Sequence, residues 1–324
     1  MGRTKRSIIP LLLSSLILTA CGGGGENNSV TTSANAAASV APQDTGVPQA
    51  TGNTATDGFN WFNFRRRQLG IQAVNRNTVI DSAALGHSVY QRENDTITHE
   101  QTVGKPGFTG RTAGDRLRAA GYPLTSSAGF AYGEVISATT DTSGANAAED
   151  LIAAIYHRFV IFEPMFKEAG VGSAGRSGGL TYFTTNFTAL GLNGGLAQGN
   201  IVHYPVADQT RVPRNFFSDN ESPDPVPNAN EVGYPVSVHA NITDSIEVQT
   251  FTITPRGGNA LPARLLRKVD DPQTPESAAA IVPLTPLTAG TVYDVRFVGK
   301  VSGIGANNVP WSSNINRSWS FTTQ

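Results

Sequence analysis

The 324-residue chain has one cysteine, few charged residues and no apolar run long enough to cross a membrane. The single cysteine, Cys21, excludes an intramolecular disulfide, so the folded part must be held together by its core alone. The longest apolar run, from Ile8 to Leu18, is shorter than the roughly 20 residues that a spanning helix needs. Charged residues make up 15% of the chain, and 24 Lys and Arg face 25 Asp and Glu. No basic surface of the kind that binds nucleic acid is therefore expected.

The position of Cys21 is the most informative feature that is present. The apolar run follows three basic residues and ends in Leu18-Thr19-Ala20-Cys21, which is the pattern of a bacterial lipoprotein signal peptide. It predicts that residues 1–20 are removed and that Cys21 is lipidated on its thiol and its new amine. More than one acyl chain anchors a protein firmly, where a single chain is marginal. The alternative is an ordinary secretory signal peptide with a chance cysteine.

Composition divides the rest of the chain into a tether and two folded regions. Residues 21–57 are mostly small and polar, which predicts a lipidated, flexible tether, with order beginning near Phe59. Residues 58–192 mix helical and strand patterns, and residues 193–230 are rich in Gly and Pro, which predicts a linker with a first strand. Residues 231–324 alternate apolar and polar side chains with a period of two, which predicts an antiparallel β-sandwich. The predicted fold class is α+β.

Helices and strands are interleaved in residues 58–192. Helical patterns fall at 77–90, 109–120 and 149–159, and strand patterns fall at 130–137, 170–174 and 180–189. Asn77 is placed to cap the first of these helices, and Gly121 is placed to stop the second. The strands are spaced too irregularly for repeated βαβ units, so a layered α+β domain is expected.

The five histidines lie in different sequence settings. His239 alternates with apolar strand residues and is predicted to face solvent, and His203 is predicted to do the same. His87 lies on an apolar helix and is predicted to be half-buried and to donate to a backbone carbonyl. His99 follows a helix in a loop, where binding residues are common. His157 lies off the apolar stripe of its helix.

One carboxylate is also in an unusual setting. Glu134 lies inside an apolar, strand-like run, where an acid is rarely buried unless it is paired. Because His99, Glu134 and His157 come from three separate elements, they are candidates for one shared cleft.

Motifs in a fixed order over residues 59–190 resemble the CAP superfamily, which is named for cysteine-rich secretory, antigen 5 and pathogenesis-related proteins. The matching pieces are Asn63 with Arg66 or Arg67, Ala83-Ala84-x-x-His87-Ser88, Thr98-His99, Gly121-Tyr122, Gly133-Glu134-x-Ile136, and His157-Arg158 followed by Phe166 and Gly170-Val171-Gly172. The resemblance implies an α-β-α sandwich with a cleft where two histidines and acidic residues meet.

By this resemblance, His99 and His157 are the cleft histidines and Glu134 is the first cleft acid. Two neutral imidazoles can hold zinc or another divalent cation, and Glu134 beside a metal-bound water would be a candidate general base. The chain departs from the family on the helix that carries His157, where the second acid is missing. Glu149 and Glu163 are the nearest acids, but neither is at the matching position.

The last third of the chain resembles a bacterial Ig-like domain. Residues 287–293 resemble the corner where a tyrosine hydroxyl bonds back to the backbone, and residues 319–323 resemble a last sandwich strand. Such a likeness concerns architecture and does not identify a ligand.

These features predict a protein of the cell envelope, lipid-anchored through Cys21 and extracytoplasmic. With Gly22 rather than an aspartate after Cys21, the outer membrane is expected if the cell has two membranes. The predicted role is binding, in the His/Glu cleft, of a divalent metal or a cell-wall, lipid or protein ligand. The alternatives are a metal-assisted extracellular hydrolase with Glu134 as general base and a purely structural protein. No nucleophile elbow or His-Glu-x-x-His motif is present, so the sequence does not decide whether the protein is an enzyme.

Overall fold

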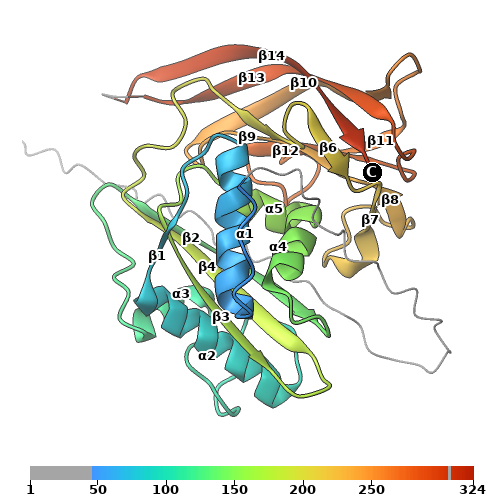
Figure 1. The fold of residues 1–324 in the computed structure, drawn as a ribbon. Helices are drawn as coiled ribbons and strands as arrows, with labels where there is room; N and C mark the ends of the chain where they lie inside the picture. The colour runs from blue at the N-terminus through green and yellow to red at the C-terminus, as the bar shows by residue number, and fades with distance from the viewer. Residues whose placement is uncertain (1–45, 306–307) are drawn as a thin grey trace, which may run out of the picture.

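The computed structural model describes residues 46–305 and 308–324, which form two stacked regions (Figure 1). Cys21, the predicted signal peptide and most of the predicted tether lie outside the described residues. Within the described part of the chain, no helix has both the length and the apolar character needed to cross a membrane.

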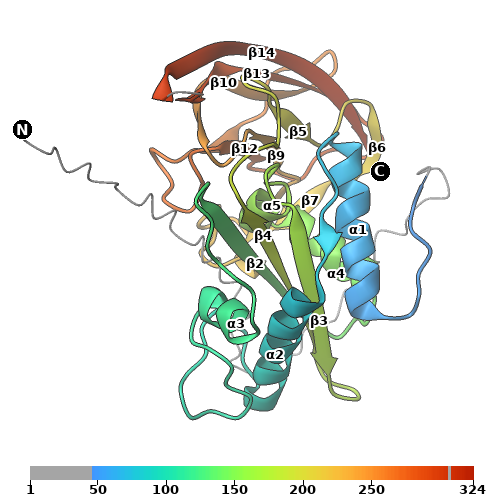
Figure 2. The ribbon, with the colours of Figure 1, turned by 90° about the vertical axis from the view of Figure 1, so that its left-hand side faces the viewer.

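The first region is a four-stranded sheet with helices on both faces (Figures 1 and 2). The strand order is β1-β3-β4-β2, in which β1 pairs with β3 in parallel and the other pairs are antiparallel. The strands are β1 (Asn75–Arg76), β2 (Phe130–Thr139), β3 (Glu168–Gly175) and β4 (Thr181–Leu190). The helices on one face are α1 (Thr54–Gln68), α4 (Gly144–Ala153) and α5 (Ile155–Ile161), and those on the other are α2 (Thr78–Asn94) and α3 (Ala113–Ala119). The predicted α-β-α sandwich is confirmed.

Local capping explains where most of these helices begin. The side chain of Asn77 accepts the backbone N–H of Val79 at 2.9 Å, as predicted for the start of α2. A capping box between Thr112 and Asp115 starts α3 later than predicted. The predicted helix 149–159 is wrong as one element, because Ala154 has an extended backbone and separates α4 from α5.

Order begins earlier than the sequence pattern predicts. Asn53 caps α1, which starts at Thr54 and not near Phe59. The buried carboxylate of Asp57 accepts the backbone N–H and hydroxyl of Thr51 at 2.8 and 2.7 Å. These bonds fix the chain before the helix, so the predicted end of the tether at residue 57 is too late.

Two glycines let α2 lie directly on the sheet. A Cβ at Gly170 would come within 2.2 Å of the backbone nitrogen of Asp81, and one at Gly172 would come within 2.2 Å of the backbone nitrogen of Leu85. Both glycines lie on β3 and face α2. The Gly-Val-Gly motif is therefore a requirement of close packing between helix and sheet.

The second region is rich in strands and contains two four-stranded sheets and one small sheet. The strand orders are β10-β13-β14-β6, β11-β12-β9-β5 and β7-β8. The strands are β5 (Val202–Tyr204), β6 (Gln209–Val212), β7 (Asn215–Phe217), β8 (Glu231–Gly233), β9 (Val236–His239), β10 (Asp244–Pro255), β11 (Ala263–Leu266), β12 (Ala278–Pro283), β13 (Val292–Ile304) and β14 (Pro310–Thr323), with a 3-10 turn at Ser218–Asn220. Residues 193–230, predicted as a linker with a first strand, thus supply β5 and β6 to the two large sheets and β7 to the small one. At the predicted corner, the hydroxyl of Tyr293 accepts the backbone N–H of Thr288 at 2.8 Å.

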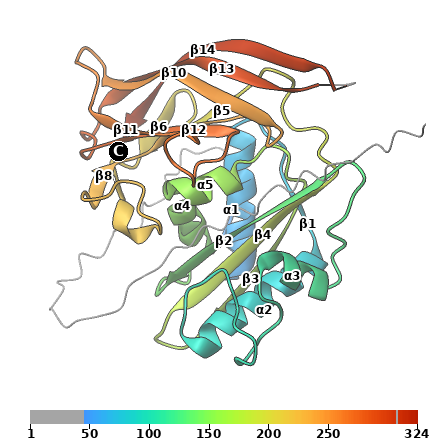
Figure 3. The ribbon, with the colours of Figure 1, turned by 180° about the vertical axis from the view of Figure 1, so that it is seen from behind.

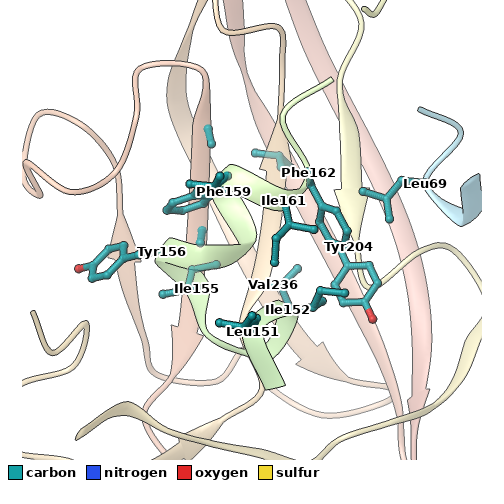
Figure 4. Close-up of a cluster of buried hydrophobic side chains, with 14 of the residues drawn as sticks. Leu69, Leu151, Ile152, Ile155, Tyr156, Phe159, Ile161, Phe162, Tyr204 and Val236 are labelled. Atoms are coloured by element: carbon teal, nitrogen blue, oxygen red, sulfur yellow. The ribbon is translucent and has the colours of Figure 1, made fainter. Parts of the chain in front are cut away.

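One continuous core joins the two regions. Figure 4 shows Leu151 and Phe159 of the α4–α5 pair on the same cluster as Tyr204 of β5 and Val236 of β9. The ring centroids of Phe162 and Tyr204 lie 5.1 Å apart. The sheet β11-β12-β9-β5 therefore has helices on one side and the other large sheet on the other side (Figure 3).

Two histidines lie in other surroundings than those predicted. His239 is 2% exposed, because β9 is an inner strand and the imidazole packs edge-on against Phe159 and Phe162. His203 is half-buried, with its ring centroid 4.1 Å from that of Trp319. Burial lowers the pKa of His239 to about 3 and that of His203 to about 4. Both are neutral at physiological pH, and both pack against aromatic rings instead of extending into solvent as predicted.

Candidate functional site

Glu134 lies on β2 and points toward α2 and α3. Its neighbour Gly133 faces α5, since a Cβ there would come within 2.6 Å of Val160, and successive strand residues face opposite sides. The Glu134 side chain is 3% exposed. Arg116 Nη2 donates to both of its carboxylate oxygens at 2.7 Å, and His99 Nδ1 lies 2.9 Å from Oε1. Glu134 is thus a buried carboxylate with two direct partners.

Further hydrogen bonds hold Arg116 and His99 in place. Arg116 Nη1 donates to the backbone carbonyl of His99 at 2.9 Å. Gln101 Nε2 donates to His87 Nδ1 at 2.9 Å, so the proton of a neutral His87 is on Nε2, which donates to the Thr98 carbonyl at 2.6 Å. The predicted bond from His87 to a backbone carbonyl is present, but His87 is fully buried and its Nε2 is only 3.8 Å from Glu134.

The charges of the cluster follow from its burial. Desolvation alone would raise the pKa of Glu134, but Arg116 and the two histidines hold this pKa far below the usual range of a carboxyl group. Burial lowers the pKa of His87 to about 4, so its ring is neutral. His99 must donate its Nδ1 proton to the ionised Glu134. A general base works best with a pKa near the operating pH, so this carboxylate is poorly suited to abstract a proton.

His157 lies on the other side of the sheet. Its Nδ1 is 2.9 Å from Glu221 Oε1, and the same oxygen accepts the backbone N–H groups of Tyr156 and His157 at 2.8 and 3.2 Å. Glu221 therefore closes the first turn of α5, which has no capping side chain of its own at Ala154. Figure 3 shows α5 and the α2–α3 pair on opposite sides of β2 and β4.

The structure thus brings together two of the three predicted site residues. Glu134 and His99 are in contact, but His157 is paired elsewhere, so the predicted three-residue cleft is wrong. Within residues 46–305 and 308–324, no group of three or more His, Cys, Asp or Glu side chains is arranged to hold a metal ion. His99 and His157 each keep one buried ring nitrogen without a partner, but these nitrogens belong to separate sites. The residues do not fit a shared zinc or other divalent cation.

Comparison with known proteins gives the family of this region. The family model of the cysteine-rich secretory protein family, CAP, matches residues 59–187. Residues 59–187 are a CAP domain. None of the curated proteins matches the chain.

Two solved structures are similar to part of the chain. An extracellular protein with an SCP domain from Bacillus anthracis is 23% identical, with a TM-score of 0.35 over 44% of this chain. An outer surface protein from Borrelia burgdorferi is 14% identical, with a TM-score of 0.34 over 41% of this chain and 89% of its own. The chain spans 44% of the length of the Bacillus protein.

The two alternative acids of the CAP domain are also held by buried contacts. Glu149 accepts the indole N–H of Trp61 at 2.6 Å and pairs with Arg65 at 2.9 Å. Glu163 is 5% exposed and accepts the backbone N–H of Ile242, in the second region, at 3.0 Å. Neither acid reaches His99 or His157 in the contacts of the described residues.

Sequence reasoning missed Arg116, Glu221 and the closeness of His87 to the site. A buried Glu134 needs a positively charged partner, and this need was the available signal for Arg116. The sequence alone does not choose Arg116, because two other arginines lie within five residues of Arg116. Glu221 gave no signal, because it lies in the proline-rich stretch that predicts a linker. Its contact with His157 spans 64 residues and depends on how the two regions dock.

Proposed function

We propose that this chain is a membrane-anchored, extracytoplasmic CAP-domain protein that acts at the cell envelope by binding and not by hydrolysis. The observation that carries this proposal is the state of Glu134. Arg116 holds both of its oxygens at 2.7 Å, and the side chain is 3% exposed. A carboxylate in this state stabilises the fold and has neither the pKa nor the access that a general base needs.

The anchor in this proposal is Cys21. The signal-peptide pattern before it supports export and lipidation, and the partner is then the membrane in which the acyl chains insert. Replacement of Cys21 by serine is expected to abolish incorporation of radiolabelled palmitate and to release the protein from the membrane fraction. Unchanged labelling would overturn the anchor and leave the binding role open.

The choice between binding and hydrolysis is tested with the purified mature chain and isolated cell envelopes. We expect the protein to co-sediment with the envelopes and to release no new amines, reducing ends or fatty acids, with or without added zinc. The test variant is Glu134→Gln, with its folding checked by circular dichroism. The matched control is Glu100→Gln, which changes an exposed acid. Product release that Glu134→Gln stops and Glu100→Gln does not would establish the hydrolase, and failure to co-sediment would overturn the binding role.

A further inference from the structure

The outer face of the sheet β10-β13-β14-β6 carries an open hollow of about 680 Å³. This volume is within the range of about 300–1,000 Å³ that ligand sites occupy. The sheet is the layer farthest from α2 and α3 (Figure 1). The hollow is therefore on the opposite end of the molecule from Glu134.

The strand register places the polar side chains of the hollow in two rows. Thr252, Arg296 and Ser318 are opposite one another on β10, β13 and β14. Thr254, Asp294 and Ser320 form the next row on the same strands. Neighbouring strands are about 4.8 Å apart and alternate residues about 6.8 Å apart, so the six groups cover roughly 10 by 7 Å.

All six side chains of the two rows point outward. The residues between them along the strands, Ile253, Val295 and Trp319, are 0%, 1% and 7% exposed and face the core. The outward-facing lining thus consists of hydroxyl, carboxylate and guanidinium groups and the exposed Ala207, and the buried Val295 and Trp319 complete it from below. A lipid or an apolar peptide would find no apolar surface of useful size here.

The charges of the hollow cancel. Asp294 is held by Arg256, whose Nη2 and Nε donate to it at 2.6 and 3.2 Å. Asp208 closes one end, where its backbone N–H donates to the Ser320 carbonyl at 2.7 Å. In the lining these two acids face one arginine, Arg296, and Arg256, which lies beside the hollow and pairs with Asp294, supplies the second positive charge. The hollow therefore has no net charge with which to attract an anionic or a cationic polymer.

We propose that this face binds a neutral polysaccharide chain. The hydroxyls of the two rows both donate and accept, Arg296 donates, and Asp294 accepts. Such a set matches adjacent hydroxyls of a sugar ring, each of which also donates and accepts. The inference rests on the proposed binding role and gives it a ligand class and a site outside the CAP domain.

The test is calorimetric titration of the purified mature chain with neutral tetrasaccharides of glucose, N-acetylglucosamine, mannose and galactose. We expect at least one to bind, and Arg296→Ala and Thr254→Val each to weaken its binding at least tenfold. Lys300→Ala is the matched control, because Lys300 lies on the same face of β13, outside the hollow. It is expected to bind like the wild type, and all three variants are expected to keep the wild-type melting temperature.

Three results would overturn the proposed site. The first is that none of the neutral tetrasaccharides binds. The second is that Lys300→Ala weakens binding as much as Arg296→Ala does. The third is that the protein binds only an anionic polysaccharide or lipid vesicles. The protein would still co-sediment with envelopes after each of these results if another of its surfaces binds them. The envelope-binding role and the polysaccharide site are therefore tested separately.

Discussion

The stability of this protein is expected to fall with rising pH because of one buried acid, Glu163. One of its carboxyl oxygens accepts the backbone N–H groups of Met165 and Ile242, at 2.9 and 3.0 Å, and so joins the CAP domain to the second region. The side chain also borders a small cavity of about 30 Å³, which is lined mainly by apolar residues such as Val160 and Phe166. Burial raises the pKa of Glu163 from 4.5 to about 8, although the two N–H groups and Arg66 oppose the rise.

The sign follows from linkage. The folded protein holds the Glu163 proton more tightly than the unfolded chain, so this contribution to stability is complete below pH 4.5 and is lost as the pH rises to about 8. Each pH unit between these two values lowers the free energy of unfolding by up to about 1.36 kcal/mol. The expected loss in the free energy of unfolding is therefore roughly 3 kcal/mol by pH 7 and about 4 kcal/mol by pH 8.

Glu163→Gln isolates this effect, because glutamine keeps an accepting oxygen and cannot ionise. Urea unfolding, followed by circular dichroism from pH 5 to pH 9, should give similar free energies for wild type and variant at pH 5. By pH 8 the variant should be more stable by a few kcal/mol. Glu247→Gln, at an exposed position of β10, is the control and should run parallel to the wild type. A constant difference between Glu163→Gln and wild type across this range would refute the reasoning.

Three further substitutions test other contacts by urea unfolding at pH 7. Arg116→Met leaves the Glu134 carboxylate buried and unpaired and should lower the free energy of unfolding by about 3–5 kcal/mol. The double variant Arg116→Met with Glu134→Leu should regain most of this stability. A loss below about 1 kcal/mol in Arg116→Met would contradict the buried ion pair. Gly170→Ala places a Cβ against the α2 backbone and should cost about 3 kcal/mol, while Gly179→Ala, which meets only ordinary contacts, should cost far less. Tyr293→Phe removes the acceptor of the corner hydrogen bond and should cost about 1 kcal/mol; no change would show that this bond does not stabilise the region.

Local signals in the sequence predicted much of the CAP domain. The cap at Asn77, the stop at Gly121 and the three strand patterns are governed by neighbours a few residues away, and each is present in the structure. The break at Ala154 was not predicted, because no proline or glycine marks it. At that break, the first N–H groups of α5 are satisfied by Glu221, which comes from a distant segment.

The errors at the histidines have a different physical cause. Alternation of apolar and polar residues shows which residues share a face of a strand. It identifies the solvent-exposed face only if the sheet has one face in solvent. β9 is covered on both faces, so the alternation around His239 indicated a solvent face that does not exist. The predicted cleft failed for a similar reason, since sequence order does not show that Glu134 and His157 are on opposite sides of one sheet.

The two residues that carry the most recognisable motif of the family here bind the second region. His157 pairs with Glu221, and Arg158 contacts the rings of both Tyr204 and Tyr234, with its guanidinium carbon 5.0 and 4.9 Å from their centroids. Because both side chains are fully buried in these contacts, they are not available to a ligand without separation of the two regions. The CAP domain and the strand-rich region are thus packed together through one shared core. These contacts, between residues far apart in the chain, set how the strand-rich region is placed on the CAP domain.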